Sequence, residues 1–99
     1  MAQYDVYRRP SSAHLLLDVQ SRLLDELLTR ACIPLQLKTA FLKPAPHLNP
    51  EFELEGLSYV LMTHYIVSVP ARDLRSPIAN LKNDDIKITR ALDMLYHGF

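Results

Sequence analysis

The chain of 99 residues is poor in the residues that several classes of site require. Its two glycines are too few for either of the common Gly-rich phosphate-binding loops. Its single cysteine cannot form an internal disulfide, which is typical of a protein from a reducing compartment. Eleven Lys and Arg residues balance eleven Asp and Glu residues, so the net charge is zero and no chain-wide basic field attracts nucleic acid.

Long apolar runs are also missing. The apolar-rich stretches 59–62 and 66–69 are far shorter than the ~20 residues that span a bilayer, and the first five residues lack the features of a secretory signal peptide. We therefore expect a cytoplasmic protein without membrane contact. A composition of 48% hydrophobic and 22% charged residues predicts one globular domain, residues 1–99, with a modest core that an oligomer would extend.

Alternating apolar and polar residues predict that most of the chain forms β-strands. The expected strands cover residues 3–7, 15–20, 31–37, 52–54, 57–61 and 65–69. The first two are expected to form a hairpin, and Glu55-Gly56 to turn a second one in which Gly56 supplies the positive φ. Pro34 cannot donate to a ladder, so we expect its strand to be interrupted or exposed on that side, at an edge or a bulge.

Two connecting stretches differ in how clearly they can be interpreted. Residues 43–50 contain three prolines and are expected to form a loop. Residues 21–29 are ambiguous, because Leu23, Leu24, Leu27 and Leu28 have helical spacing. A helical turn and a bulging loop both fit this stretch.

The C-terminal part has the periodicity of an amphipathic helix, predicted from about Asn83 to His97 and ending at Gly98. Asn80 or Asn83 is expected to cap its start. Its apolar stripe comprises Leu81, Ile88, Ala91, Leu92, Leu95, Tyr96 and Phe99. The predicted fold is therefore mainly β, of the α+β class: a curled antiparallel sheet with one C-terminal helix.

The residue types that carry catalysis do not form a recognisable set. The four histidines, His14, His47, His64 and His97, are too far apart for a compact zinc motif. Cys32 lies in an apolar strand, where a buried and inert thiol is expected. Glu51, Glu53 and Glu55 are expected to form a solvated face. We therefore expect no catalytic residue, no metal site and no cofactor.

The last residues, Tyr96-His97-Gly98-Phe99, place two aromatic side chains at the end of the helix. They either complete the core stripe or form an exposed anchor for a protein partner, since aromatic groups dominate interface energetics.

Several short strings occur in order along the chain: Asp5-Val6-Tyr7, Leu17-Asp18-Val19-Gln20-Ser21, Arg30-Ala31-Cys32-Ile33-Pro34-Leu35, Met62-Thr63 and Ser68-Val69-Pro70. They are followed by a helix that ends at Gly98 plus one apolar residue. With these strings the chain resembles the CcdB family of toxins from bacterial toxin–antitoxin modules, over essentially its whole length. The resemblance implies the SH3-like, barrel-type fold shared by CcdB and MazF, assembled as a homodimer.

The resemblance also implies a toxin without enzyme chemistry that binds the A subunit of DNA gyrase and traps its cleaved complex with DNA. Direct nucleic-acid binding is not expected, and a CcdA-like antitoxin is expected to neutralise the toxin. The matching gyrase-binding positions are His97, Gly98 and Phe99. The matching antitoxin-binding positions are Leu23, Leu24, Asp93 and Tyr96. His97 and Phe99 replace the Trp and Ile of the best-known pattern, and Asp93 replaces an Asn.

Two alternatives remain on the same fold. A ribonuclease toxin of the MazF/Kid type needs a basic groove with acid–base residues, which the neutral charge does not favour. An inactive paralogue would only titrate antitoxin.

Overall fold

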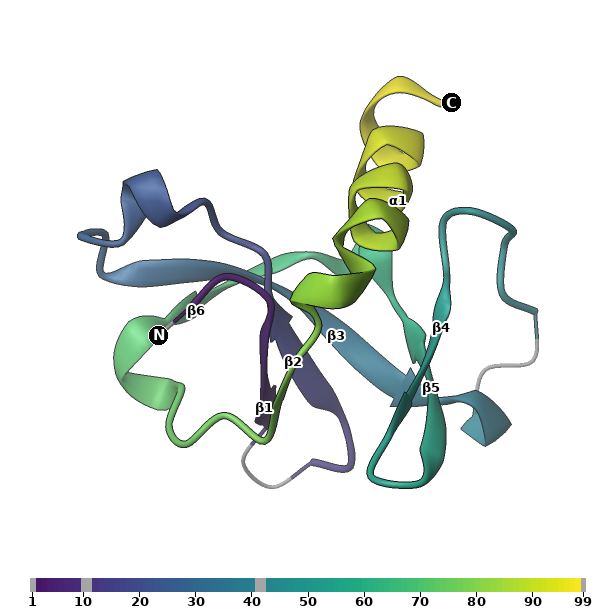
Figure 1. Cartoon of the computed structure of the whole chain (residues 1–99), viewed down its shortest axis with the longest axis horizontal. Helices are drawn as coiled ribbons and strands as arrows, with labels where there is room; N and C mark the ends of the chain where they lie inside the picture. Colours follow the sequence, from purple (N-terminus) through teal and green to yellow (C-terminus); the bar gives the residue numbers. More distant parts are fainter. Residues whose placement is uncertain (1, 10–11, 41–42, 99) are drawn as a thin grey trace.

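The computed structural model describes residues 2–9, 12–40 and 43–98, and most of this chain forms one antiparallel sheet that curls into a nearly closed barrel (Figure 1). The strands are β1 (Asp5–Arg8), β2 (Leu15–Asp18), β3 (Thr29–Leu37), β4 (Glu51–Leu54), β5 (Leu57–Leu61), β6 (Val67–Pro70) and β7 (Ala79–Asn80). They follow the order β4-β5-β3-β2-β1-β7, and β6 pairs with β3. Helix α1 (Asp85–His97) completes the fold, which confirms the predicted class.

Both predicted hairpins form. β1 pairs with β2, with Val6 opposite Leu17, and β4 pairs with β5 around Glu55-Gly56. Gly56 has φ +79 and Glu55 has φ +52, so both central residues of the turn adopt the positive φ of a type I′ hairpin. β1 begins two residues later than predicted, because Tyr4 has φ +73 and lies outside the β region.

Pro34 lies in the central strand β3, where the sequence alone predicted an edge or a bulge. Its neighbours explain why a proline fits there. β6 pairs with β3 only as far as Cys32, and β5 pairs with it only from Leu35 onward. The Pro34 carbonyl points into this gap and accepts from Met62 N–H at 2.8 Å. The missing N–H of Pro34 faces the same gap, and the Met62 carbonyl opposite accepts instead from Tyr65 N–H at 2.8 Å. β3 runs unbroken through Pro34, so only the pairing beside it is interrupted and not the strand itself, and Pro34 is buried and not exposed.

The main core lies between one face of the sheet and α1. Ile88 and Ala91 are fully buried there, in a cluster with Val6, Leu15, Leu17, Ile33, Leu35, Phe52, Leu54, Tyr59, Leu61 and Leu81. The helix ends at His97, and Gly98 caps it with φ +80, as predicted. Tyr96, in contrast, is 77% exposed and does not complete the core stripe. None of the helices in the described ranges is long and apolar enough to cross a membrane.

The start of α1 differs from the prediction. The helix begins at Asp85 and not at Asn83, because a 3-10 turn, η5 (Lys82–Asp84), precedes it. Neither Asn80 nor Asn83 caps α1, whose N-cap residue is Asp84. The side-chain Oδ1 of Asn80 accepts from the Lys82 N–H at 2.9 Å and so supports η5.

Candidate functional site

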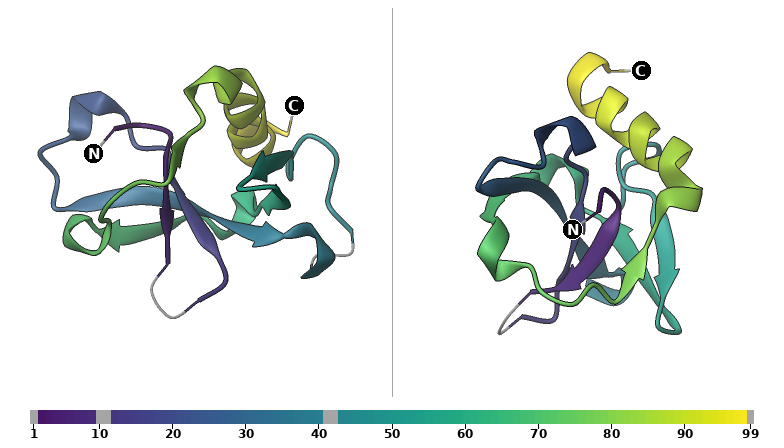
Figure 2. Two further views of the ribbon diagram at one scale, coloured as in Figure 1. Left: turned by 60° about the horizontal axis from the view of Figure 1, so that its bottom comes forward. Right: turned by 60° about the vertical axis from the view of Figure 1, so that its left-hand side comes forward.

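Residues 21–28, here called the leucine loop, form an exposed loop and not an α-helix, which settles the ambiguity left by the sequence. They contain one 3-10 turn, η1 (Arg22–Leu24), followed by a bend. Its four leucines are exposed: Leu23 by 93%, Leu24 by 49%, Leu27 by 51% and Leu28 by 87%. A regular helix does not form here, because helical spacing of apolar residues stabilises a helix only when that face is covered by other residues. The loop projects on the same side of the sheet as α1 (Figures 1 and 2).

The start of the leucine loop is held by the string Asp18-Val19-Gln20-Ser21. The Gln20 side chain forms two hydrogen bonds: its Oε1 accepts from Ala31 N–H at 3.0 Å, and its Nε2 donates to the Leu24 carbonyl at 2.9 Å. Ser21 is the N-cap of η1, with its Oγ accepting from Leu23 N–H at 3.2 Å. The polar residues of this string therefore fix the conformation that exposes Leu23 and Leu24.

Below the loop lies a buried ion pair. The Arg30 side chain is 1% exposed, and its Nε donates to Asp18 Oδ2 at 2.8 Å. Its Nη1 donates to Asp25 Oδ1 at 2.9 Å, so that the guanidinium connects β2 to the loop. Asp18 Oδ1 accepts from Gln20 N–H at 3.0 Å. The burial of Arg30 was not predicted, although strand alternation places it on the same face as the apolar Cys32.

The residues expected at the helix end lie on the last turns of α1. Asp93, Tyr96 and His97 are exposed, and the rings of Tyr96 and His97 lie 6.4 Å apart, centroid to centroid. Phe99 falls outside the described residues. The four positions expected to contact an antitoxin therefore come from two separate elements, the leucine loop and α1, which project on the same side of the sheet (Figure 2).

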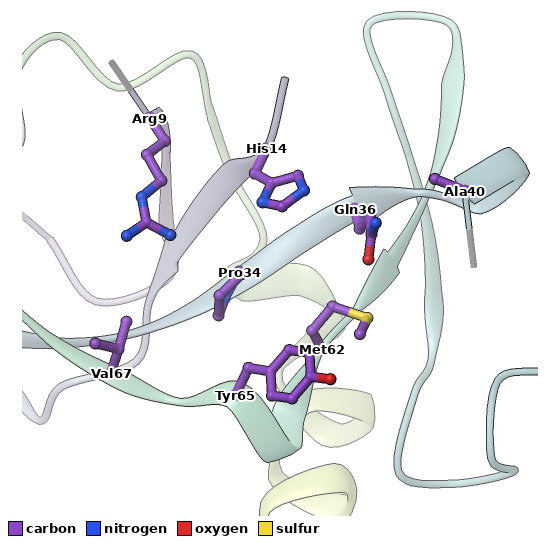
Figure 3. Close-up of a pocket in the computed structure, with 8 residues that line it drawn as sticks. All are labelled: Arg9, His14, Pro34, Gln36, Ala40, Met62, Tyr65 and Val67. Carbon is purple, nitrogen blue, oxygen red and sulfur yellow. The ribbon is translucent and has the colours of Figure 1, made fainter. Parts of the chain in front are cut away.

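The opposite face of the sheet carries an open groove of about 610 Å³ (Figure 3). Pro34 and Met62 line its apolar part, with Tyr65 beside them, while Arg9 and His14 lie together at its other side (Figure 3). No carboxylate is among the described residues that line it. The groove combines one permanent positive charge, one imidazole and apolar surface.

Cys32 and the glutamates behave as expected. Cys32 is fully buried. Glu51, Glu53 and Glu55 are exposed, with Glu51 3.2 Å from Lys38 Nζ and Glu55 2.6 Å from Arg8 Nη2. Across residues 2–9, 12–40 and 43–98, no three His, Cys, Asp or Glu side chains are grouped so that they could hold a metal ion.

We expect the free energy of unfolding to fall as the pH rises from about 9 towards 12. Burial, with the Asp18 charge second, raises the pKa of Cys32 from 9.0 to about 12. Burial, with Asp5 and Asp18 next, raises the pKa of Tyr7 from 10.0 to about 12. Both groups lose their protons at lower pH in the unfolded chain, so alkali favours unfolding; the stabilisation is complete below the unfolded pKa values and disappears as the pH passes the folded ones.

Urea denaturation at several pH values between 8 and 11 measures this decline. Cys32→Ala should reduce the decline that begins near pH 9 and leave the later part due to Tyr7. The linkage would be wrong if the free energy of unfolding of the unmodified protein stayed constant across this range.

Two comparisons with known proteins bear on these surfaces. The family model described as CcdB protein matches residues 3–98, which is nearly the whole chain. A search of the curated proteins gives no match. The matched region includes the leucine loop, the buried ion pair and α1 as far as Gly98.

Proposed function

The chain belongs to the CcdB family, and from this premise we propose that it binds the A subunit of DNA gyrase and traps the enzyme on cleaved DNA. The family comprises toxins of toxin–antitoxin modules, so the chain is the toxin component of such a module. The family match over residues 3–98 carries the proposal. The proposal goes beyond family membership in three respects: the gyrase target, the residues that contact the antitoxin, and the homodimer.

The exposed end of α1 supports gyrase as the target. Tyr96 and His97 present aromatic rings to solvent, and Gly98 ends the helix with a positive φ. The planar ring of His97 can stack on an arginine side chain of a partner. We assign gyrase binding to His97, Gly98 and Phe99.

The leucine loop supports an antitoxin surface. Leu23 and Leu24 expose apolar area that an antitoxin segment would cover, and Tyr96 and Asp93 on α1 would extend the same surface. We also propose a homodimer, because Tyr65, Ile66 and Val67 leave further apolar area exposed beside the edge of β6.

A cleavage assay tests the gyrase proposal. The purified protein, a bacterial gyrase and supercoiled plasmid are incubated, and the DNA is analysed after denaturation of the enzyme. We expect cleaved DNA to accumulate, because the toxin prevents religation. Deletion of Gly98 and Phe99 should abolish the effect, while circular dichroism and sedimentation show an intact fold and dimer. If the full-length protein binds no gyrase from its own host, the proposal is wrong.

The groove in Figure 3 is the observation that favours a ribonuclease as the second candidate. Arg9 could bind a phosphate and His14 could transfer a proton, although no carboxylate lies among the described lining residues. Single-stranded RNA incubated with the nuclease-free protein decides this point. Cleavage that is lost in Arg9→Ala and His14→Ala would favour the ribonuclease over the gyrase poison.

A further inference from the structure

We propose that Arg30 is a positioning residue, which holds the leucine loop in one conformation through Asp25 and thereby sets the affinity of Leu23 and Leu24 for the antitoxin. The inference rests on the antitoxin surface of the proposed function. Arg30 itself is 1% exposed, so it cannot touch a partner and can act only through the loop.

The Arg30 guanidinium lies between the buried end of β2 and the exposed leucine loop. Nε is bound to Asp18 at the end of β2, and Nη1 to Asp25, which directly follows η1. Asp25 is 49% exposed, whereas Asp18 is fully buried. Nη2 is buried and has no hydrogen-bond partner within the described part of the chain.

A contribution to the stability of the fold is a poor explanation for the cluster of Arg30, Asp18 and Asp25. Removing two opposite charges from water is costly, and well-packed apolar side chains often stabilise a protein as much or more. The buried Nη2 without a partner adds a further cost. Such a cluster is better explained by conformational specificity, which the loop needs because its own leucines point to solvent and provide no core anchor.

The other hydrogen bonds of the leucine loop hold its two ends, and Arg30 holds its middle through Asp25. Ser21 holds the first turn through Leu23 N–H, and the Leu28 carbonyl accepts from Ala71 N–H at 2.9 Å at the far end. Gln20 binds the Leu24 carbonyl. Between Leu24 and Leu28, Asp25 is the side chain that ties the loop to the sheet.

An ordered loop binds more tightly than a mobile one, because a partner does not have to order it first. If only a fraction of the molecules has the binding conformation, the apparent affinity falls by that fraction. Arg30 therefore raises affinity by keeping nearly all molecules in the binding conformation.

The test compares Asp25→Ala with Glu26→Ala in the full-length protein. Both remove one negative charge from the same loop, but Glu26 is exposed and forms no ion pair within the described residues. Amide hydrogen exchange of Leu24 and Leu27, whose N–H groups bond within the loop, measures loop order in the free protein. Isothermal titration with the antitoxin encoded by the neighbouring reading frame measures affinity.

We expect Asp25→Ala to speed exchange at Leu24 and Leu27 and to weaken antitoxin binding, each by roughly tenfold, and Glu26→Ala to change neither. Asp25→Asn, which keeps an oxygen for Nη1, should lie between Asp25→Ala and the unmodified protein. If Asp25→Ala weakens binding but leaves exchange unchanged, Asp25 contacts the antitoxin directly and the inference is wrong. Equal exchange in Asp25→Ala and Glu26→Ala also overturns it. If the unmodified protein binds no antitoxin, the proposed function fails, and exchange still decides whether Arg30 orders the loop.

Discussion

Replacing Arg30 by methionine is expected to lower the free energy of unfolding by about 3–5 kcal/mol, the range for breaking a buried ion pair by removing one partner. Methionine fills much of the space of the arginine stem. The loss of stability therefore comes mainly from the buried charge of Asp18, which is left unpaired. That carboxylate is fully buried and would lose its charged partner, keeping the hydrogen bond that its Oδ1 accepts from the Gln20 N–H. Urea denaturation at pH 7, followed by circular dichroism, measures the change.

A second substitution separates charge from packing in this prediction. Asp18→Asn combined with Arg30→Met removes the unpaired charge and keeps an oxygen for the Gln20 N–H. The double variant should recover a large part of the stability lost in Arg30→Met, because apolar and neutral replacements of a buried pair are often tolerated. If the two substitutions are simply additive, the loss in Arg30→Met comes from packing and not from the unpaired Asp18.

Leu23→Asp is expected to weaken antitoxin binding by about 30-fold or more, as for an interface hot spot worth about 2–4 kcal/mol. Leu23 is 93% exposed and has almost no contacts in the free protein to lose. Its substitution should therefore change the free energy of unfolding by less than about 0.5 kcal/mol. In the complex, the aspartate would have to be desolvated in an apolar contact without a partner charge.

Leu57→Asp is the matched control for Leu23→Asp. Leu57 is also exposed, by 51%, but it lies at the β4–β5 turn and not in the leucine loop. Calorimetric titration with the antitoxin should give the unmodified affinity for Leu57→Asp. Equal weakening by both substitutions would mean that any added charge disturbs binding, and the leucine loop would lose its assignment.

Sequence patterns predicted the sheet well because the signals are local. Period-two alternation identified every strand except the two-residue β7, and Gly56 identified the turn of a hairpin whose strands then pair by proximity. The helix and its end at Gly98 followed from apolar spacing and the left-handed conformation that glycine adopts. The family resemblance identified Leu23, Leu24, Asp93 and Tyr96 as candidate contacts, and the structure shows each of them exposed.

Other features depend on residues distant in sequence and could not be predicted locally. Pro34 is accommodated because it lies where the pairing partner of β3 changes from β6 to β5. Arg30 in an apolar strand is explained only once Asp18 and Asp25 surround its guanidinium. Tyr96 has the spacing of a core residue, but it is 77% exposed, because the C-terminal end of α1 projects beyond the sheet (Figure 1).

The amino-acid sequence by itself determined the class of the fold, the hairpin turn, the helix end and the family, because these depend on local spacing and on strings that stay in order. Only the tertiary structure decided that the four leucines lie in an exposed loop rather than in a helix packed on the core. The physical reason is that burial depends on what covers a side chain. The described residues leave the four leucines of this loop half to fully exposed, while buried Arg30 holds the loop in place from below.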